Sequence, residues 1–441
     1  MPGRKLIVVT TDLFVRSFVR TGALSAIDDD GCFWAVRAGI VHEDEIREHP
    51  RFAGAFEVDE RRAVAYLDLR HASMARRRRL SRTMDVKIAK LAKRSERLRY
   101  GVLGLPGVFE RFERRVLGRL GLNEGFQRIL REVDPELVVA PVAGTEAAAY
   151  DLERGASAVG ARTVLLVNGW DNVSSKAYFP VLPDLLGVWG DQSVEHAVAM
   201  HGIPRERAVP IGVPTFEGHF AWDPASSASP YDFPYVLFAG CAIPFDERTA
   251  LRRVAEALDR AGSDAKIVYR PHPWRQPRRV DDTVAEGEFG RVVIDRQVRE
   301  RYLEATGRMY VADGYLPSLD YYPALLGFAR CVVCPLSTMM VEAAIVETPV
   351  VALAYDDRVH DIPPSLAAEF EHFQGMDDID GFEVVRDLAE LDGALARAGS
   401  RPATAPSLRE QISYWLYSDD RPYSERLAAL LQGEPAPLLA S

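Results

Sequence analysis

An arginine and a histidine follow a short apolar segment of the chain. Lys266–Tyr269 has the composition of a buried strand, and Arg270 and His272 come directly after it. Pro271 and Pro273 flank the histidine and restrict the backbone, so the imidazole should be held in one direction. An arginine can bind a phosphate through two hydrogen bonds, and a histidine can donate to a phosphate oxygen and assist a leaving group. We therefore expect a phosphate-binding turn here rather than a surface turn with an incidental histidine.

A second polar group stands between an apolar segment and a helical pattern. Ser337 and Thr338 follow Cys331–Cys334, and Ser337 has the position of an N-cap. The unpaired amides and the dipole of a helix start favour an anion, and two hydroxyls would add donors for a phosphate. Glu342 lies about one helical turn beyond Thr338, where its carboxylate can accept hydrogen bonds from a ribose. An ordinary capped helix is the alternative interpretation.

A third polar group, residues 168–176, follows the apolar segment Thr163–Val167. Asp171 is the first candidate for a general base toward an acceptor hydroxyl. Trp170 could stack on a sugar or a base, and Lys176 could bind a phosphate. The remaining polar side chains expected on this acceptor side are Asn172, Ser174 and Ser175. A solvated loop containing an Asx turn is the alternative.

Other carboxylates also stand at the ends of apolar segments. Asp12 and Glu146 are alternative general bases, and either could instead be a cap or a first-turn acid of a helix. The run Asp28-Asp29-Asp30 precedes a strand pattern and ends in Gly31, which is typical of a turn and not of a metal site. We expect no metal and no cofactor, so that arginine, histidine and a helix end would neutralise the charge of a donor phosphate.

Strand and helix patterns alternate through both halves of the chain, which predicts an α/β fold with parallel sheets and right-handed crossovers. The expected strands of the first half are Leu6–Thr10, Cys32–Val36, Leu137–Val142, Thr163–Val167, Leu185–Trp189 and Ala208–Val213. Those of the second half are Tyr235–Ala239, Lys266–Tyr269, Val292–Ile294, Cys331–Cys334 and Pro349–Leu353. Expected helices include Gly125–Glu132, Ser193–His201, Glu247–Ala261, Tyr321–Ala329, Thr338–Val346 and Ser365–Phe373.

The composition divides the chain into two Rossmann-like domains. A stretch rich in proline and serine, 220–234, is expected to link an N-terminal acceptor-side domain, 1–219, to a C-terminal donor domain, 235–405. Helices in the tail, 406–441, could cross back. Loops at the carboxyl ends of the strands should face a cleft between the domains. Gly240 follows the first strand of the donor domain and is therefore expected among the donor-binding residues.

Composition and charge exclude several classes of protein. The chain has 441 residues, of which 47% are hydrophobic and 27% charged, as in ordinary globular proteins. No apolar run reaches the roughly 18–20 residues of a membrane helix, and no signal peptide is recognisable, which favours the cytoplasm. Four cysteines do not form a disulfide framework. The net charge of −10 gives no overall attraction to nucleic acid.

One segment departs from this acidic balance. Within a helical region at 71–120, Arg76–Arg99 holds eleven Lys or Arg against two acids. Its apolar residues recur with helical spacing, which predicts one amphipathic helix with a common apolar side: Leu80, Met84, Ile88, Leu91 and Leu98. Such a helix could place the protein at the inner face of the cell membrane, on anionic lipid, or could be a solvated helix paired with acids elsewhere. Nucleic acid is disfavoured, since Tyr100 is the only neighbouring aromatic residue.

The two donor-side motifs together resemble the C-terminal half of GT-B fold glycosyltransferases. The resemblance covers about Tyr235–Leu353 and is greatest to CDP-glycerol glycerophosphotransferases and to sialyl- and Kdo-transferases of surface polysaccharides, which have paired His-Pro and Ser-Ser/Thr motifs. It implies that His272, Ser337 and Thr338 hold the donor phosphate and that Glu342 contacts the nucleotide ribose. Thr338 stands where some members have a second serine, and the first half has no recognisable catalytic-base motif of the family.

The resemblance implies a metal-independent transferase. It would move a sugar or a glycerol-phosphate-like group from a nucleotide donor, with cytidine favoured over uridine, to a glycan or lipid-linked acceptor in the synthesis of a capsule or another cell-envelope polysaccharide. A UDP-N-acetylglucosamine 2-epimerase is one alternative, although that family has Ser-Gly-Gly where this chain has Ser337-Thr338-Met339. An inactive nucleotide-binding subunit of a glycan assembly complex is another.

Overall fold

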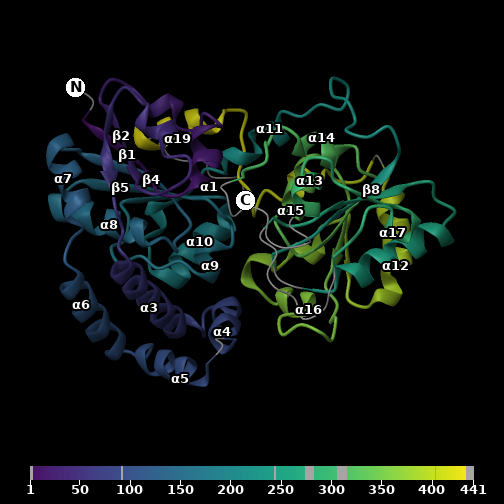
Figure 1. The fold of residues 1–441 in the computed structure, drawn as a ribbon, viewed down its shortest axis with the longest axis horizontal. Coiled ribbons are helices and arrows are strands. Elements are labelled where there is room, and N and C mark those ends of the chain that lie inside the picture. Colours follow the sequence, from purple (N-terminus) through teal and green to yellow (C-terminus); the bar gives the residue numbers. More distant parts are fainter. Residues whose placement is uncertain are drawn as a thin grey trace. The chain divides into compact units, whose positions relative to one another are not determined.

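The computed structural model divides the chain into two compact units (Figure 1). It describes residues 3–90, 93–242, 245–273, 283–304, 315–402 and 404–433. The first unit comprises Met1–Thr215 and Tyr414–Ser441, and the second comprises Phe216–Ser413. The second unit is thus inserted into the first. The segment 220–234, expected as a linker, falls within the second unit, where Tyr231 donates a hydrogen bond to Asp295.

The first unit contains a seven-stranded sheet in the order β3-β2-β1-β4-β5-β6-β7, with every neighbouring pair of its described strands parallel. In the register of its centre, Ile7 pairs with Trp34 on one side and Val139 on the other. The strands are β1 Lys5–Val9, β2 Cys32–Arg37, β3 Phe52–Phe56, β4 Leu137–Val142, β5 Arg162–Val167, β6 Leu185–Val188 and β7 Ala208–Pro210.

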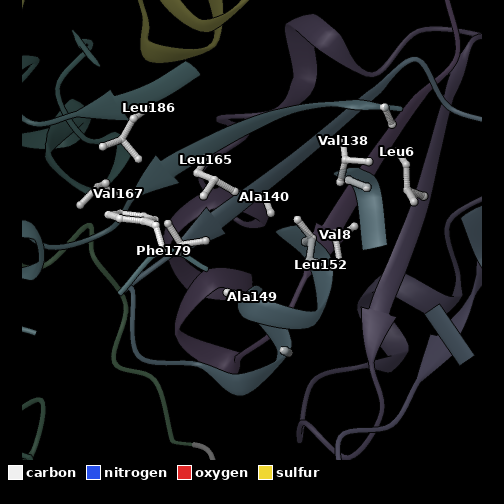
Figure 2. Close-up of a cluster of buried hydrophobic side chains, with 14 of the residues drawn as sticks. Leu6, Val8, Val138, Ala140, Ala149, Leu152, Leu165, Val167, Phe179 and Leu186 are labelled. Atoms are coloured by element: carbon white, nitrogen blue, oxygen red, sulfur yellow. The ribbon is translucent and has the colours of Figure 1, made fainter. Parts of the chain in front are cut away.

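Helices cover both faces of this sheet, as the nearly continuous apolar sequence of β4 requires. One face carries the core of Figure 2, in which Leu6, Val138 and Leu165 from three strands pack with Leu152 of a helix. The helices of the first unit are α1 Asp12–Phe14, α2 Asp44–Arg47, α3 Glu60–Arg77, α4 Arg82–Ala89, α5 Arg94–Leu103, α6 Val108–Leu120, α7 Glu124–Val133, α8 Ala147–Val159, α9 Asn172–Ser175, α10 Asp191–His201 and α19 Tyr423–Leu431. Short π and 3-10 segments lie at Val15–Val19, Ser25–Ile27 and Arg205–Arg207.

Helix α7 illustrates why these elements form. The side chain of Asn123 caps the helix by accepting a hydrogen bond of 3.1 Å from the amide of Phe126. Phe126, Ile129, Leu130 and Val133 recur with helical spacing and are all buried in the core. The sequence pattern and the cap therefore agree on the position and on the inner face of the helix.

The second unit contains a six-stranded sheet in the order β10-β9-β8-β11-β12-β13, again parallel between all described neighbours. Its strands are β8 Tyr235–Ala239, β9 Lys266–Arg270, β10 Val292–Ile294, β11 Val332–Pro335, β12 Val350–Leu353 and β13 Phe382–Val385. Its helices are α11 Glu217–Phe220, α12 Glu247–Arg260, α13 Arg299–Glu304, α14 Tyr322–Gly327, α15 Met339–Ile345, α16 Pro364–Ala367, α17 Leu391–Gly399 and α18 Leu408–Gln411. Short 3-10 segments lie at Pro214–Phe216, Glu288–Gly290, Glu371–Phe373, Met376–Asp378 and Leu388–Glu390.

Both sheets confirm the expected fold class of two parallel α/β domains. Every strand expected from the sequence is present, with ends that differ by three residues at most. The strands that the sequence did not predict, β3 and β13, lie at sheet edges. The expected helix Ser365–Phe373 is wrong: α16 ends at Ala367, and a separate 3-10 turn follows at Glu371–Phe373.

The expected single amphipathic helix across the basic segment is also wrong. The segment is divided among the end of α3, all of α4 and the start of α5, and the side chain of Ser81 caps α4 by accepting from the amide of Met84. Met84 and Ile88 are buried in a cluster with residues of α3 and α8, whereas Leu80 and Leu98 are exposed; Leu91 lies outside the described residues. The apolar residues therefore do not share one side. Figure 1 shows α3 to α6 grouped together in the first unit.

The C-terminal helix returns to the first unit, as the sequence suggested. Tyr423 and Leu427 of α19 join the core on the second face of the first sheet, together with Phe18 (Figure 1). The segment before α19 also binds this unit, since the amide of Tyr417 donates to the Trp189 carbonyl at 2.7 Å. Among the described residues, no helix combines the length and the hydropathy needed to cross a bilayer.

Candidate functional site

The strand order of the second sheet defines where a ligand site is expected. From β8, strands β9 and β10 are added on one side of the sheet, and β11, β12 and β13 on the other, so the strand order reverses between β8 and β11. In open α/β sheets, ligands bind beyond the carboxyl ends of the strands at such a switch point. Gly240 follows β8, and Ser337 follows β11. His272 follows β9, the neighbour of β8. The topology therefore brings the donor-side residues predicted from three separate strands to one edge of one sheet.

Arg270, the last residue of β9, is engaged in a buried polar cluster. Its guanidinium forms an ion pair with Asp295, and a second nitrogen donates to Gln297 at 2.8 Å and to the hydroxyl of Tyr322 at 2.6 Å. Asp295, which is fully buried after β10, also accepts from the hydroxyl of Tyr321 at 2.7 Å. At least three of the five N–H donors of this guanidinium are thus engaged inside the cluster. In this structure the guanidinium fixes the start of the loop that carries His272.

His272 lies partly buried in the two residues that follow β9. The loop is tied to the neighbouring strand end, because the amide of Gly240 donates to the Arg270 carbonyl at 2.9 Å. Gly240 itself is packed against α12: a Cβ at this position would lie 2.8 Å from a carboxylate oxygen of Glu247. That carboxylate is held in turn by the hydroxyl of Tyr269. A larger residue after β8 would therefore have to displace this carboxylate.

The local structure around Ser337 corrects one expectation. Helix α15 begins at Met339, with Thr338 at the cap position in helical conformation, and neither hydroxyl caps the helix. The hydroxyl oxygen of Ser337 is buried and makes no hydrogen bond to oxygen or nitrogen within the described part of the chain; its polar neighbour is the thiol of Cys334. Thr338 is partly exposed. Ser337 is thus a buried hydroxyl at the switch point and not the N-cap that the sequence suggested.

Glu342 lies on α15 and is buried against a histidine that the sequence did not single out. Its carboxylate oxygen is 3.5 Å from Nε2 of His219, on α11. The imidazole of His219 is almost fully buried, forms an edge contact with Phe216, and makes no hydrogen bond among the described residues. The side chain of Glu342 retains 11% exposure. A ribose could reach it only along this narrow exposed edge.

A second histidine stands beyond the neighbouring strand β12. The carboxylate of Asp357 accepts from Nδ1 of His360 at 2.6 Å and from the amide of Asp246 at 3.1 Å, which links the loop after β12 to the start of α12. Burial raises the pKa of Asp357, but the hydrogen bonds from His360, Val359 and Asp246 outweigh it and hold the pKa below its usual range. Nε2 of His360 is buried and has no hydrogen-bond partner in the described ranges.

The sequence analysis did not single out the Asp357–His360 pair. The spacing of three residues between an acid and a histidine after an apolar strand is a signal that could have found it. In this arrangement the imidazole of His360 is oriented by Asp357 and keeps its second nitrogen available. Such a group can donate a hydrogen bond or take up a proton.

In the first unit, most of the expected acceptor-side residues are buried. Asn172, Ser174 and Ser175 lie in the short helix α9. Trp170 is also buried and packs against Trp189, with ring centroids 6.2 Å apart. This packing disfavours the expected stacking of Trp170 on a sugar or base, which stays a prediction. By contrast, Asp171 and Lys176 remain partly exposed, with 29% and 31% of their side chains accessible.

The other two candidate bases flank the switch point of the first sheet, between β1 and β4. Asp12 is the first residue of α1, and its carboxylate accepts from the amide of His42 at 2.8 Å. The carboxylate of Glu146 accepts from the amides of Ala143 and Thr145, at 2.8 and 3.1 Å, and burial raises its pKa. Both carboxylates therefore accept hydrogen bonds from backbone amides, whereas Asp171 contacts the side chains of Ser175 and Lys176.

The Asp28–Asp30 run forms a turn, as the sequence predicted. Asp29 accepts from the amide of Gly31 at 3.0 Å and pairs with Lys5, while Asp28 accepts from the indole nitrogen of Trp34 at 3.0 Å. Among the described residues there is no group of three or more His, Cys, Asp or Glu side chains arranged to hold a metal ion.

Comparison with known proteins places this fold in a recognised class. No family model matches the sequence, and no curated protein matches it either. Solved structures do resemble it over their whole length. CalG4, the calicheamicin glycosyltransferase, is 13% identical, with a TM-score of 0.52 over 98% of each chain. A putative UDP-N-acetylglucosamine 2-epimerase from Listeria monocytogenes is 11% identical, with a TM-score of 0.53 over 100% of each chain.

MnaA from S. aureus, solved with UDP, is 12% identical, with a TM-score of 0.51 over 99% of each chain. At these identities the likeness is one of fold. The protein has two parallel-sheet α/β domains matching those of the GT-B glycosyltransferases. The resemblance to the CDP-glycerol and His-Pro subgroup stays a prediction.

Proposed function

We propose that this protein is a transferase that uses a nucleotide-activated donor and transfers a sugar or a glycerol-phosphate-like group to a glycan or lipid-linked acceptor, without a metal or a cofactor. The nucleotide would bind at the carboxyl edge of the second sheet. The proposal has its main support in one observation: His272, Gly240, Ser337 and the Asp357–His360 pair follow four adjacent strands, β9, β8, β11 and β12.

The donor residues have separable roles in this proposal. His272 would donate to the phosphate oxygens, and Nε2 of His360 would do so in the imidazolium form, because Nδ1 already donates to Asp357. The buried hydroxyl of Ser337 would complete the phosphate contacts after a side-chain rotation. Arg270 would act mainly as a positioning residue, since its guanidinium is bound to Asp295 and Tyr322. Glu342 would bind the ribose through its exposed edge.

Asp171 is proposed as the general base. An acceptor hydroxyl would lose its proton to this carboxylate, and His272 would supply a proton or a hydrogen bond to the leaving nucleotide. Lys176 lies 3.1 Å from the Asp171 carboxylate, and Ser175 donates to it at 2.9 Å. Both contacts orient the carboxylate, which a positioned base requires.

Nucleotide binding can be measured first, by thermal unfolding with CMP, CDP, UDP and GDP. A ligand that binds only the folded state, present at a concentration of 100 times its dissociation constant, stabilises the protein by about 2.7 kcal/mol. We expect cytidine nucleotides to give the largest increase in Tm, a preference that rests on the family resemblance alone. His272→Ala should weaken binding of the preferred nucleotide by roughly 10- to 100-fold, the value of a hydrogen bond to a charged group.

His42→Ala is the matched control, because it removes an imidazole from the first unit. It should leave nucleotide binding unchanged. Nucleotide binding that is equally strong in His272→Ala and in the wild type would count against this donor site. Binding without any transfer or donor hydrolysis, tested with CDP-glycerol and CMP- and UDP-sugars, would favour an inactive nucleotide-binding subunit.

An epimerase acting on a UDP-sugar is a second candidate, because the likeness to the Listeria structure is as close as that to the glycosyltransferase. Incubation with UDP-N-acetylglucosamine and analysis of the products distinguishes the two. Formation of the 2-epimer without release of the sugar would establish the epimerase. Transfer to an acceptor, or slow release of free sugar, would support the transferase.

A further inference from the structure

Three cationic side chains of the first unit gather beside the candidate base. Lys176 follows α9, Lys87 lies on α4, and Arg70 lies on α3. Two of them come from the helical region that the function proposed above does not use. The contacts between that region and the sheet show how the cations are brought there.

Helices α3 and α4 are bound to the loops that follow β4 and β5. Ser81, at the start of α4, donates to the Ser174 carbonyl at 2.6 Å, and Lys87 donates to the Ser175 carbonyl at 3.4 Å. Arg70 donates to the Thr145 carbonyl at 3.4 Å. The helices therefore hold a lysine and an arginine over the carboxyl ends of two adjacent strands.

The cations there are only partly neutralised. Asp171 is paired with Lys176, through contacts of 3.1 and 3.4 Å. A second nearby carboxylate is that of Glu146; burial raises its pKa, and its oxygens accept hydrogen bonds from backbone amides. Burial is the main cause that lowers the pKa of Lys87 to about 8; the charges of Lys176 and Arg70 act in the same direction, and Asp171 opposes them. The cluster carries more positive charge than its carboxylates offset.

Hydrogen-bond donors in and beside the cluster are also unused. Nε of Arg70 is buried and has no hydrogen-bond partner in the part of the chain that the structure describes. The same holds for the side-chain amide nitrogen of Asn172, a residue that is 3% exposed. Buried donors are rarely left without partners unless a ligand or an ion supplies an acceptor. An anion with several oxygens would offset the positive charge and offer an acceptor to the Arg70 guanidinium.

We propose that Arg70, Lys87 and Lys176 form a binding site for a phosphoryl group, such as the terminal phosphate of a phosphorylated acceptor. The proposal deepens the proposed function and rests on it only for the role of the ligand as acceptor. A phosphate bound here would place a neighbouring hydroxyl of the same molecule near Asp171. The helices α3 and α4 would thus determine which acceptors are used.

Binding of inorganic phosphate tests the site directly. Isothermal titration at constant ionic strength, with chloride as the replaced anion, compares the wild type with Lys87→Met and Lys176→Met, which keep the length of the side chain and remove its charge. We expect phosphate affinity to fall at least about tenfold in each variant, as for the loss of one hydrogen bond to a charged group. Lys90→Met is the matched control, since Lys90 is exposed at the end of the same helix.

Binding of two further probes identifies the kind of molecule that carries the phosphoryl group. Soluble glycerol 3-phosphate represents a free acceptor, and phosphatidylcholine vesicles with and without phosphatidate represent a lipid-linked one. Binding of either probe that depends on Lys87 and Lys176 supports the site. Circular dichroism and the Tm of each free variant verify that the fold is intact.

The inference is overturned if the wild type does not bind phosphate. It is overturned as well if the wild type and all variants bind phosphate with equal affinity, because phosphate would then be an adventitious ion only. It is also overturned if His272→Ala abolishes phosphate binding while both lysine variants retain it, because the phosphate would then occupy the donor site. Nucleotide binding measured on the same samples is independent. Normal nucleotide binding with no lysine-dependent phosphate binding rejects this site and leaves the proposed function standing.

Discussion

The buried pair of Arg270 and Asp295 gives the most direct test of how the donor-side loop is held. We consider Asp295→Asn, which preserves the shape of the side chain and removes its charge. Asp295 is fully buried and accepts hydrogen bonds from Arg270, Tyr321 and Tyr231. In the variant, the guanidinium remains inside the protein without a counter-charge, and an amide nitrogen replaces one of the acceptors.

The size of the effect follows from that loss. Removing one partner of a buried ion pair costs about 3–5 kcal/mol, because the remaining charge stays buried and unpaired. Such a change raises the equilibrium constant for unfolding by roughly two to four powers of ten, at about 1.4 kcal/mol per tenfold. We expect the loss of stability to be confined to the second unit, which contains both residues.

Hydrogen–deuterium exchange in increasing urea, read by mass spectrometry, reports the two units separately. Peptides from β8 and β9 should lose protection at lower urea in Asp295→Asn, while peptides from β4 and β5 should not change. Asp264→Asn is the control: Asp264 pairs with Arg330 at 2.8 Å, but both side chains are largely exposed. An exposed pair contributes little to stability.

Equal unfolding of Asp295→Asn and Asp264→Asn would refute the reasoning, because it would mean that burial of the first pair has no energetic consequence. A nucleotide assay adds a second criterion. If Arg270 positions the His272 loop, nucleotide affinity should fall in Asp295→Asn even under conditions where the second unit is fully folded.

Three further predictions concern packing and pH. Gly240→Ala should reduce the free energy of unfolding of the second unit by about 1–3 kcal/mol in thermal unfolding, because the new Cβ would approach the Glu247 carboxylate to 2.8 Å. Leu427→Ala should cost about 2–5 kcal/mol in urea unfolding, since it empties a fully buried position between α19 and the first sheet. The folded-state pKa of Asp357 lies below its unfolded value, so its contribution is present above that value and is lost as the pH falls through the folded pKa. Stability should therefore decrease below about pH 4, and less steeply in Asp357→Asn.

Matched variants separate these effects from nonspecific ones. Gly399→Ala, at a helical glycine with no atom within 4 Å of the new Cβ, should be neutral or stabilising. Leu98→Ala removes a side chain that is 71% exposed and should have little effect. Identical pH profiles for Asp357→Asn and the wild type would contradict the assignment of this carboxylate.

Most strands could be predicted because their positions follow from the local amino-acid composition. β4 and β8 are apolar, β-branched and bounded by turn residues, so composition alone locates them. β3 and β13 were not predicted because their burial is mixed, so neither has a clear apolar pattern, and β3 contains Gly54 with a positive φ of 143°.

The side chains of the candidate site were only partly predictable. Arg270 and His272 were identified from spacing, but the partner that buries the arginine, Asp295, lies on another strand end. His219 and Glu342 likewise meet only through the packing of α11 on α15. In the basic segment, the helical spacing of the apolar residues predicted one continuous helix. It did not reveal the break at Ser81, because Ser81 and the residues before it can either continue a helix or end one. Contacts between distant residues decided the first two of these outcomes, and a local cap at Ser81 decided the third.

The insertion of the second unit between Thr215 and Tyr414 has a consequence for biosynthesis. The last helix of the first unit, α19, is translated only after the whole of Phe216–Ser413 has been made. At about 5–20 residues per second, this delay amounts to roughly 10–40 seconds. During that time the cluster around Phe18 lacks its covering residues Tyr423 and Leu427, so the ribosome-bound chain exposes apolar surface that a chaperone could recognise.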